Sequence, residues 1–453
     1  MVLKKLPDWL IDLCKDIKSS GGRAFLVGGC VRDGLLGHLV KDYDIEVYRL
    51  PSAQVREILE RHGKVNTVGE HFAVYKLRPS RKSDTEVDVS LPRRESKHGS
   101  GHRGFIVQGD PWLSFQEAAS RRDFTINAIL YDPIDGIFID PCNGLRDLNN
   151  KELRAVNANT FKDDSLRVLR AAQLSSRYRL RIEESTKLLC QNTNLKDIPK
   201  ERIWEELKKI LLFSPVPSLG FTNLLELGVI NQLFPMLWEL HSSLVIQNPY
   251  SPRDSAWNYV LASLDRGRFF AEELSEPEKI SVFLSIIGTR LTHSSLISFL
   301  DCLGLHTYRG FHVREQVITL RNVHLLPYKA FYQAQQGKPV AFILRRIARL
   351  TDPKLVDCLV KALFLEASEQ IVVWFEENLQ ALGAEKPFLR GRHILELGIP
   401  PGPTVRKILL QVYEYQIDGQ VNSFENAKLL ASDLLSKMNL RTFQESGLRN
   451  SLT

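Results

Sequence analysis

The chain has 453 residues, a charged fraction of 25% and a formal net charge of +7. This length exceeds one ordinary hydrophobic core, so we expect roughly two to four domains, and the small positive charge permits a nucleic-acid partner without requiring one. Six widely separated cysteines with no C-x-x-C pair argue against a zinc site and a disulfide framework, which favours a cytoplasmic protein. No stretch of about 18 apolar residues offers a membrane span, and we expect no export signal.

The predicted elements change character near residue 155. Before this point, short β-rich runs alternate with helical stretches such as SAQVREILERHG, which is typical of a mixed α/β domain. The runs are RAFLVGG, YDIEVYRL, FAVYKLR, EVDVSLP, AILYDP and GIFIDP. Beyond it, apolar residues recur at three-to-four spacing, as in SLRVLRAAQLSSRYRL and ERIWEELKKILLF, so the remainder is expected to be helical. Prolines and glycines near 214–220, 247–252, 383–391 and 398–403 predict breaks between helical parts.

The first candidate site lies within residues 25–48, FLVGGCVRDGLLGHLVKDYDIEVY. Alternate side chains of a strand share a face, so Asp42 and Asp44 are expected on one side and Tyr43 and Ile45 on the other. Two carboxylates so close repel each other unless a cation lies between them, and magnesium, which prefers hard oxygen ligands, is the usual cation. The pattern therefore predicts a metal site at Asp42 and Asp44.

The glycine pair before these aspartates is suited to phosphate. Backbone without a Cβ at Gly28 and Gly29 can approach a triphosphate and direct N–H groups toward it, and Arg32 can add a bidentate contact. Together the stretch predicts a site for a nucleoside triphosphate and metal. The alternative is a solvated acidic edge strand that follows an ordinary glycine turn.

A second β-rich run, TEVDVSLP, supplies further carboxylates. If this run forms a strand beside the first, Asp88 can join Asp42 and Asp44 as a third carboxylate. Three carboxylates suit a two-metal mechanism, in which one ion lowers the pKa of an attacking hydroxyl and the other holds the phosphates and the leaving group. Glu86 lies on the same face and is the competing choice.

Five ordered motifs carry a resemblance to a known family. After GGCVRD and DYD come RRDFTINA from residue 121, DPCNGLRDL from residue 140, DDSLR from residue 163 and PKERIWEELKK from residue 199. This set resembles the class II tRNA nucleotidyltransferases, the CCA-adding enzymes and bacterial poly(A) polymerases of the DNA polymerase beta-like superfamily. The resemblance covers roughly the first 210 residues, and GRHILELGIPPGPTVRKIL from residue 391 is similar to the tail of bacterial members.

The resemblance implies template-independent addition of C and A nucleotides to the 3′ end of tRNA, from CTP and ATP, with release of pyrophosphate. The catalytic residues that it implies are Asp42, Asp44 and Asp88, with two magnesium ions held at Asp42 and Asp44. The nucleotide-binding residues that it implies are Gly28, Gly29, Arg32, Arg121, Asp123, Asn127, Asp164, Arg167 and Arg170. Among these, Arg121, Asp123 and Asn127 would support the sugar and the geometry of the site.

The DDSLR motif has a physical interpretation as a base reader. On a helix, Asp164 and Arg167 share a face and can present an acceptor beside a donor. This pair fits the amino group and ring nitrogen of cytosine and adenine, whereas uracil and guanine would place an oxygen against the carboxylate. The alternative is a routine ion pair on a helix that Asp163 caps. Asp163 also stands where the family pattern has glutamate.

The resemblance also implies a fold class and a division into parts. We expect an α/β nucleotidyltransferase head with a mixed sheet, followed by an all-helical neck, body and tail. The expected ranges are 1–155 for the catalytic head, 156–225 for the neck with the base-recognition pocket, 226–380 for an RNA-binding body and 381–453 for a tRNA-binding tail. The expected partners are tRNA, CTP and ATP, with no membrane, and the chain is expected to be a monomer or a homodimer.

Two basic clusters and one glycine-rich segment bear on RNA and on the product. The clusters, which are either solvated faces or RNA contacts, comprise Arg93, Arg94, Lys97, His98, His102 and Arg103, and then Arg345, Arg346 and Arg349. Segment 96–120 corresponds to a lever that in the family reshapes the pocket from C to A, and Gly99, Gly101, Gly104 and Gly109 suit such mobility. Its uninterrupted length favours full CCA addition over addition of CC alone. Addition of A alone, a poly(A) polymerase and a non-catalytic RNA-binding relative stay open.

Overall fold

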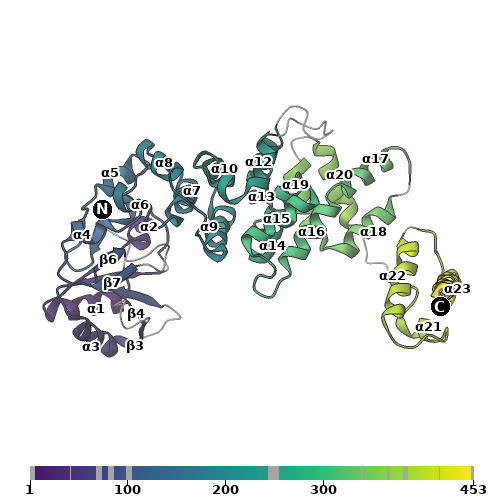
Figure 1. Ribbon diagram of the computed structural model, residues 1–453, viewed down its shortest axis with the longest axis horizontal. Coiled ribbons are helices and arrows are strands. Elements are labelled where there is room, and N and C mark those ends of the chain that lie inside the picture. Colours follow the sequence, from purple (N-terminus) through teal and green to yellow (C-terminus); the bar gives the residue numbers. More distant parts are fainter. Residues whose placement is uncertain are drawn as a thin grey trace. The chain divides into compact units, whose positions relative to one another are not determined.

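A computed structural model of the chain describes residues 6–40, 42–67, 74–79, 86–97, 105–242, 255–338, 340–364, 368–380, 386–417 and 419–449. The chain separates into two compact units. The first comprises Met1–Trp238 with Cys302–Gly304, and the second comprises Glu239–Asp301 with Leu305–Thr453. The predicted fold class is confirmed, because a mixed sheet with helices is followed by a largely helical remainder (Figure 1). None of the described helices is long and apolar enough to cross a membrane.

Within the described residues, the head is built on a seven-stranded sheet in the order β3-β4-β5-β2-β1-β8-β9. The strands are β1 (Arg23–Val27), β2 (Asp44–Tyr48), β3 (Gly63–Thr67), β4 (Val74–Pro79), β5 (Val87–Ser90), β8 (Leu130–Asp132) and β9 (Ile137–Ile139). β2 and β5 run parallel, and the other neighbouring pairs are antiparallel. Because β2 and β5 are parallel, their N-terminal ends lie at the same edge of the sheet.

Helices pack against this sheet through apolar stripes. The head helices are α1 (Asp8–Ser19), α2 (Gly29–Leu35), α3 (Ser52–His62) and α4 (Phe115–Ser120). In α1, Leu10, Leu13 and Ile17 recur at three-to-four spacing and are 0% exposed. Burying each such side chain stabilises the fold by roughly 1.5–3 kcal/mol relative to leaving it in water.

Strand β2 has a different environment on each of its faces. Ile45 and Val47 point into the core that α1 and α3 share with the sheet. Asp44, Glu46 and Tyr48 alternate with them and therefore lie on the other face. Tyr48 packs there in a smaller apolar cluster that includes residues of α4. Alternation is thus seen from Asp44 to Tyr48, and it puts Asp44 and Glu46 on the face of α4. Asp42 precedes the strand, so its sharing of a face with Asp44 stays a prediction.

The segment predicted as a mobile lever, 96–120, is partly described. β7 (Phe105–Gly109) pairs antiparallel with β6 (Arg93–Lys97). The helix α4 begins after Ser114, which forms a capping box with Glu117. Three of the four glycines named above, Gly99, Gly101 and Gly104, lie outside the described residues, as do His98, His102 and Arg103.

Beyond the sheet, the chain continues mainly as helices. The elements that follow are η1 (Thr125–Asn127), α5 (Gly144–Asn149), β10 (Glu152–Leu153), α6 (Ala158–Phe161), α7 (Leu166–Tyr178), β11 (Arg181–Ile182), α8 (Glu184–Gln191), α9 (Lys200–Phe213), α10 (Pro217–Glu226), α11 (Val229–Leu233) and α12 (Pro235–Ser242). α7 packs against α9 and α10. The gap between α9 and α10 falls at the first predicted break, because Pro217 can begin a helix but cannot continue one.

The second unit is helical in its described residues. Its helices are α13 (Ala256–Phe270), α14 (Glu276–Gly288), α15 (His293–Leu303), α16 (Val313–Val323), α17 (Leu326–Gln335), α18 (Ala341–Leu350), α19 (Pro353–Phe364), α20 (Glu369–Gln380), α21 (Gly391–Leu395), α22 (Pro403–Ile417) and α23 (Phe424–Arg449). α14 packs on α16, and α13 packs on α19. The break near 247–252 lies outside the described residues, and the predicted boundaries at 155, 225 and 380 stay predictions.

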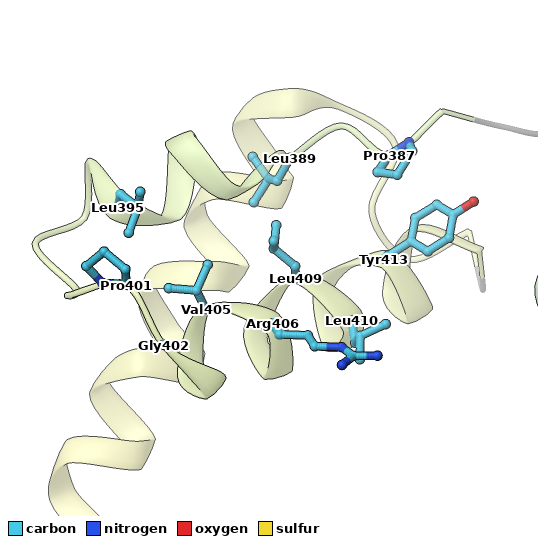
Figure 2. Close-up of a pocket in the computed structure, with 10 residues that line it drawn as sticks. All are labelled: Pro387, Leu389, Leu395, Pro401, Gly402, Val405, Arg406, Leu409, Leu410 and Tyr413. Carbon is cyan, nitrogen blue, oxygen red and sulfur yellow. The ribbon is translucent and has the colours of Figure 1, made fainter.

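The last three helices enclose a small core of their own, which includes Ile394, Ile408 and Val412. An apolar pocket of about 460 Å³ lies beside this core, lined by residues such as Leu389, Val405 and Leu409 (Figure 2). It contains none of the predicted catalytic or nucleotide-binding residues.

Candidate active site

The glycine turn joins β1 to α2. Gly28 is the N-cap of α2 and has a φ of 71°, in the left-handed region that side chains other than glycine rarely adopt. A Cβ placed on Gly28 would lie 3.6 Å from Nη1 of Arg122 and 3.6 Å from Oδ2 of Asp44. The turn therefore places bare backbone beside one guanidinium and one carboxylate.

Arg32 lies beside this turn and is only 6% exposed. Its Nη1 donates to Oδ1 of Asn127 at 2.6 Å, and its Nη2 donates to the hydroxyl of Tyr178 at 2.7 Å. Oδ1 of Asp33 accepts from Nε and Nη2 at 2.9 and 2.7 Å, and the Tyr178 ring centroid lies 4.5 Å from the guanidinium carbon. A Cβ on Gly29 would lie 3.6 Å from Nη2. Arg32 is thus next to the predicted triphosphate turn, and protein groups hold its guanidinium in place.

The two predicted carboxylate runs meet in the sheet. Asp44 of β2 pairs in register with Asp88 of β5, so both side chains lie on one face of neighbouring parallel strands. The Asp44 side chain reaches solvent, but nearby protein atoms limit its hydration. This desolvation, followed by the charge of Asp88, raises the pKa of Asp44 to about 6, and Asp42 just before the strand adds to the shift.

These carboxylates fit a divalent cation. Carboxylate oxygens are hard ligands, and a cation between them would relieve the repulsion that raises the pKa of Asp44. In the described part of the chain, no three His, Cys, Asp or Glu side chains already converge on one metal position. Magnesium in proteins is commonly held by one or two carboxylates together with substrate phosphates.

The competing carboxylate, Glu86, is held by cations. Its Oε1 lies 2.7 Å from Nζ of Lys76 and its Oε2 lies 3.1 Å from Nε of Arg78. The hydrogen bond from Lys76, and next that from Arg78, lowers the pKa of Glu86. Asp88 lies 3.4 Å from Lys76 and is the residue opposite Asp44. This register favours Asp88 over Glu86 as the third carboxylate.

Arg121 lies at the end of α4 and contacts a buried carboxylate. Its Nη2 donates to Oε1 of Glu46 at 2.7 Å, and Nη2 of Arg122 lies 3.4 Å from the same oxygen. The hydroxyl of Tyr48 donates to Oε2 of Glu46 at 2.8 Å. Arg121 thus contacts the same face of β2 as Asp44, at the position of Glu46, two residues further along the strand.

Asp123, Asn127 and Arg170 are brought together as one network. Oδ2 of Asp123 accepts from Nε and Nη2 of Arg170 at 2.7 and 2.6 Å, and its Oδ1 accepts from Nδ2 of Asn127 at 3.0 Å. Burial alone would raise the pKa of Asp123, but Arg170 and then Asn127 outweigh it, so the pKa is lowered. Because Asn127 also accepts from Arg32, the network links RRDFTINA to the glycine turn.

The predicted base-reading pair is arranged differently from the expectation. The helix α7 begins at Leu166, so Asp164 precedes the helix instead of lying on it. Its Oδ1 accepts from the Leu166 N–H at 3.2 Å, and its Oδ2 lies 3.3 Å from Nη2 of Arg202 in α9. Arg167 is 8% exposed and donates to the carbonyls of Thr160 and Arg121 at 2.8 and 2.6 Å. The difference arises because an aspartate that precedes a helix can accept a hydrogen bond from a backbone N–H of the first turn, which stabilises the start of the helix.

Sequence reasoning missed several residues that contact the predicted set, among them Glu46, Arg122, Tyr178 and Arg202. Glu46 carried a detectable signal, because a carboxylate in the buried part of a strand needs a cationic partner. Arg122 stands inside the quoted RRD motif, and Arg202 stands inside the quoted PKERIWEELKK motif. Tyr178 gave no local signal, since its partner Arg32 is 146 residues away in the sequence.

Two family descriptions match the chain. Residues 24–154 match the Poly A polymerase head domain, and residues 179–240 match the probable RNA and SrmB-binding site of polymerase A. The first match spans the glycine turn, Asp44, Asp88 and the RRDFTINA segment. Residues 24–154 are therefore similar to the head domain of poly(A) polymerases.

Similar proteins and structures agree with this match. The Multifunctional CCA protein of Pasteurella multocida is 34% identical over 287 residues, which cover 61% of this chain and 64% of that protein. The one from Stenotrophomonas maltophilia strain K279a is 37% identical over 226 residues, which cover 48% of this chain and 53% of that protein. The chain thus matches less than two-thirds of the length of either relative.

Solved structures share the fold across almost the whole chain. The CCA-adding enzyme of Thermotoga maritima complexed with tRNA has a TM-score of 0.62 and 21% identity, covering 95% of this chain and 97% of that one. The CCA-adding enzyme of Bacillus stearothermophilus in complex with CTP has a TM-score of 0.61 and 20% identity, covering 97% and 100%. The predicted resemblance to the class II tRNA nucleotidyltransferases is confirmed as a likeness: residues 24–154 match the Poly A polymerase head domain, and the chain shares the fold of the solved CCA-adding enzymes.

Proposed function

We propose that the chain adds C, C and A to the 3′ end of tRNA from CTP and ATP, without a nucleic-acid template. The observation that carries this proposal is the in-register pair of Asp44 and Asp88 beside the Gly28 turn, within a match to the Poly A polymerase head domain. The names of the relatives and the tRNA, CTP and ATP complexes of the similar structures support the substrates.

In the proposed reaction, the 3′-hydroxyl of tRNA attacks the α-phosphate, a new O–P bond forms, and the bond to the leaving pyrophosphate breaks. Asp42 and Asp44 would hold two magnesium ions, with Asp88 as the third carboxylate. Such ions lower the pKa of an attacking hydroxyl and stabilise the leaving oxygen. The carboxylates must be ionised for this role, so the raised pKa of Asp44 is a cost that substrate and metal offset on binding.

The chain's own residues would bind and orient the nucleotide. Backbone N–H groups at Gly28 and Gly29 would approach the triphosphate, with Arg32 held beside the turn by Asn127. Arg121 and Asp123 would support the sugar, and their contacts to buried partners keep them in fixed positions. We propose Arg170 as the group that holds Asp123 in this arrangement.

Asp164 and Arg167 are proposed to read the base. A carboxylate accepts and a guanidinium donates, so the two side chains can present an acceptor beside a donor. The Asp164 carboxylate would accept from the amino group of C or A. The Arg167 guanidinium would face the ring nitrogen.

The rest of the chain is proposed to hold tRNA, with residues 156–225 as the neck, 226–380 as the body and 381–453 as the tail. Arg345, Arg346 and Arg349 of α18 are candidates for phosphate contacts, and Arg349 also forms an ion pair with Glu414 at 2.5 Å. The proposed location is the cytoplasm, and the proposed state is a monomer or a homodimer.

An incorporation assay tests the proposal. Purified protein receives magnesium, CTP and ATP labelled at the α-phosphate, and one of three tRNA substrates that end at the discriminator nucleotide, at C or at CC. CCA addition predicts that each substrate is extended to the same CCA end and no further. Omitting ATP should stop the first substrate after two C residues.

Three alternatives give different products in the same assay. An A-adding enzyme extends only tRNA that ends in CC, and by a single A. A poly(A) polymerase, which the name of the matched head domain makes the nearest rival, runs on past one adenosine. A non-catalytic RNA-binding relative incorporates nothing while still binding tRNA.

A further inference from the structure

Glu46 is a charged side chain in the interior of the head. It lies two residues after Asp44 on the same face of β2 and is 1% exposed. A carboxylate so deeply buried destabilises the fold unless cations and hydrogen bonds compensate it. Neither the metal site nor the base reader proposed above uses Glu46.

Two adjacent arginines compensate this carboxylate. Nη2 of Arg121 and Nη2 of Arg122 lie 2.7 and 3.4 Å from its Oε1, and Tyr48 donates to its Oε2. Glu46 thus joins the strand of Asp44 to the segment after α4 through both arginines.

The joined segment borders the proposed nucleotide site on two sides. Nη1 of Arg122 lies 3.6 Å from the position of a Cβ on Gly28, and the Arg122 side chain is 17% exposed. The carbonyl of Arg121 accepts from Arg167, one of the proposed base readers. A shift of these arginines would move groups at both ends of a bound nucleotide.

We propose that Glu46 is a positioning residue for the nucleotide. Its carboxylate fixes the Arg122 guanidinium beside the glycine turn, where the guanidinium faces the phosphates of CTP or ATP. Without this carboxylate, the hydrogen bond from Nη1 of Arg122 to the Asn127 carbonyl, 3.4 Å long, would be left to hold the guanidinium. Further ordering of Arg122 on binding would have an entropic cost. The inference rests on the proposed function, because it takes the ligand of this site to be a nucleoside triphosphate.

The main variant is Glu46→Gln, which keeps the shape of the side chain and removes its charge. The matched control is Asp132→Asn. Asp132 is also a buried carboxylate, 4% exposed, whose Oδ2 lies 2.5 Å from Nη2 of Arg23. Arg23 begins β1 and Gly28 follows its end, so this second pair lies at the opposite end of the strand from the glycine turn.

The measurements are equilibrium binding of CTP and ATP in magnesium without tRNA, the KM for nucleotide and for tRNA, and the melting temperature. Glu46→Gln should weaken binding of both nucleotides by about tenfold and raise their KM equally, with the KM for tRNA unchanged. Asp132→Asn should lower the melting temperature and leave nucleotide affinity as in the wild type. If Glu46→Gln lowers the melting temperature without changing nucleotide affinity, Glu46 is purely structural and the inference fails.

A second variant keeps the test decisive if Glu46→Gln does not fold. Arg122→Gln should weaken nucleotide binding by the same factor of about ten, and unchanged affinity would overturn the inference. Where both fold, the double variant should be no weaker than either single one, since both remove the same contact. Additive losses would contradict the inference. A wild-type protein that binds CTP and ATP but extends no tRNA would refute the proposed function and leave this inference intact.

Discussion

Asp44 and Glu46 lie two residues apart on one face of one strand, yet they have opposite environments. Asp44 is at the sheet edge opposite Asp88, and its pKa is raised to about 6. Glu46 is buried between Arg121 and Arg122, and its pKa is lowered. Glu46 has arginine partners that compensate its charge within the fold. Asp44 faces another carboxylate, so a bound cation would stabilise its ionised form. We propose that this difference separates a residue that holds the site together, Glu46, from one that takes part in its chemistry, Asp44.

The strongest test of this contrast is removal of the edge carboxylate. Asp44→Ala should reduce nucleotide incorporation on the order of a thousandfold or more, because metal and phosphates lose a ligand. Its tRNA affinity and melting temperature should stay close to those of the wild type. Asp42→Ala should behave alike. Retention of more than a few per cent of wild-type activity, measured at saturating magnesium, would contradict the metal assignment.

Removal of the inner carboxylate, Glu46, should reduce the stability of the fold more than removal of Asp44 does. Glu46→Ala leaves two partly buried guanidinium groups without their anion, so we expect a loss of about 3 kcal/mol in the free energy of unfolding. Urea unfolding measures it, with Asp44→Ala as the control, for which the change should be below about 1 kcal/mol. Equal losses in the two variants would erase the distinction drawn between the two positions.

The third carboxylate extends the comparison to the neighbouring strand. Asp88→Asn should be severe for incorporation, at about a hundredfold or more, because Asp88 faces Asp44. Glu86→Gln should have a much smaller effect, since Lys76 and Arg78 already hold Glu86. A larger loss in Glu86→Gln than in Asp88→Asn would show that the third carboxylate was misplaced.

Asp164 resembles Glu46 in having an arginine partner and resembles Asp44 in its proposed contact with substrate. Asp164→Ala should relax discrimination against UTP and GTP by roughly tenfold to a hundredfold, because a site that accepts the amino group then loses its acceptor. Incorporation of each nucleotide, measured separately, gives this ratio. An even loss for all four nucleotides would make Asp164 a structural residue at the start of α7.

The smallest effect is a difference in pH dependence. For Asp44 the folded pKa lies above the unfolded one, so its contribution to stability is full below pH about 4 and is lost as the pH rises through about 6. For Glu46 the folded pKa lies below the unfolded one, so its contribution is present at neutral pH and is lost in acid. Melting temperatures of the metal-free wild type and the two variants measure both effects. The difference between wild type and Asp44→Asn should fall as the pH rises from about 4 to about 6, and the difference between wild type and Glu46→Gln should rise with pH below about 4.5. Slopes of the same sign would refute this assignment.

Much of the head was predictable from local patterns. Alternation in DYDIE and TEVDV set which side chains share a face, and the register of Asp44 with Asp88 then follows from the pairing of the two strands. The contacts of Glu46, Arg32 and Asp164 were not predictable, since their partners Arg121, Tyr178 and Arg202 lie 75, 146 and 38 residues away in the chain. Local periodicity also predicted that Asp164 lies on a helix. In the structure Asp164 precedes the helix, and its carboxylate accepts a hydrogen bond from the N–H of Leu166, the first helical residue.

The most direct test of the proposed function is extension of one tRNA transcript that ends at the discriminator nucleotide. With magnesium, CTP and ATP, the wild-type chain should produce a single product three nucleotides longer, ending in CCA, and Asp44→Ala should produce none. A transcript left unextended while one ending in CC gains a single A would contradict CCA addition and establish the A-adding alternative. A ladder of added adenosines would instead establish a poly(A) polymerase.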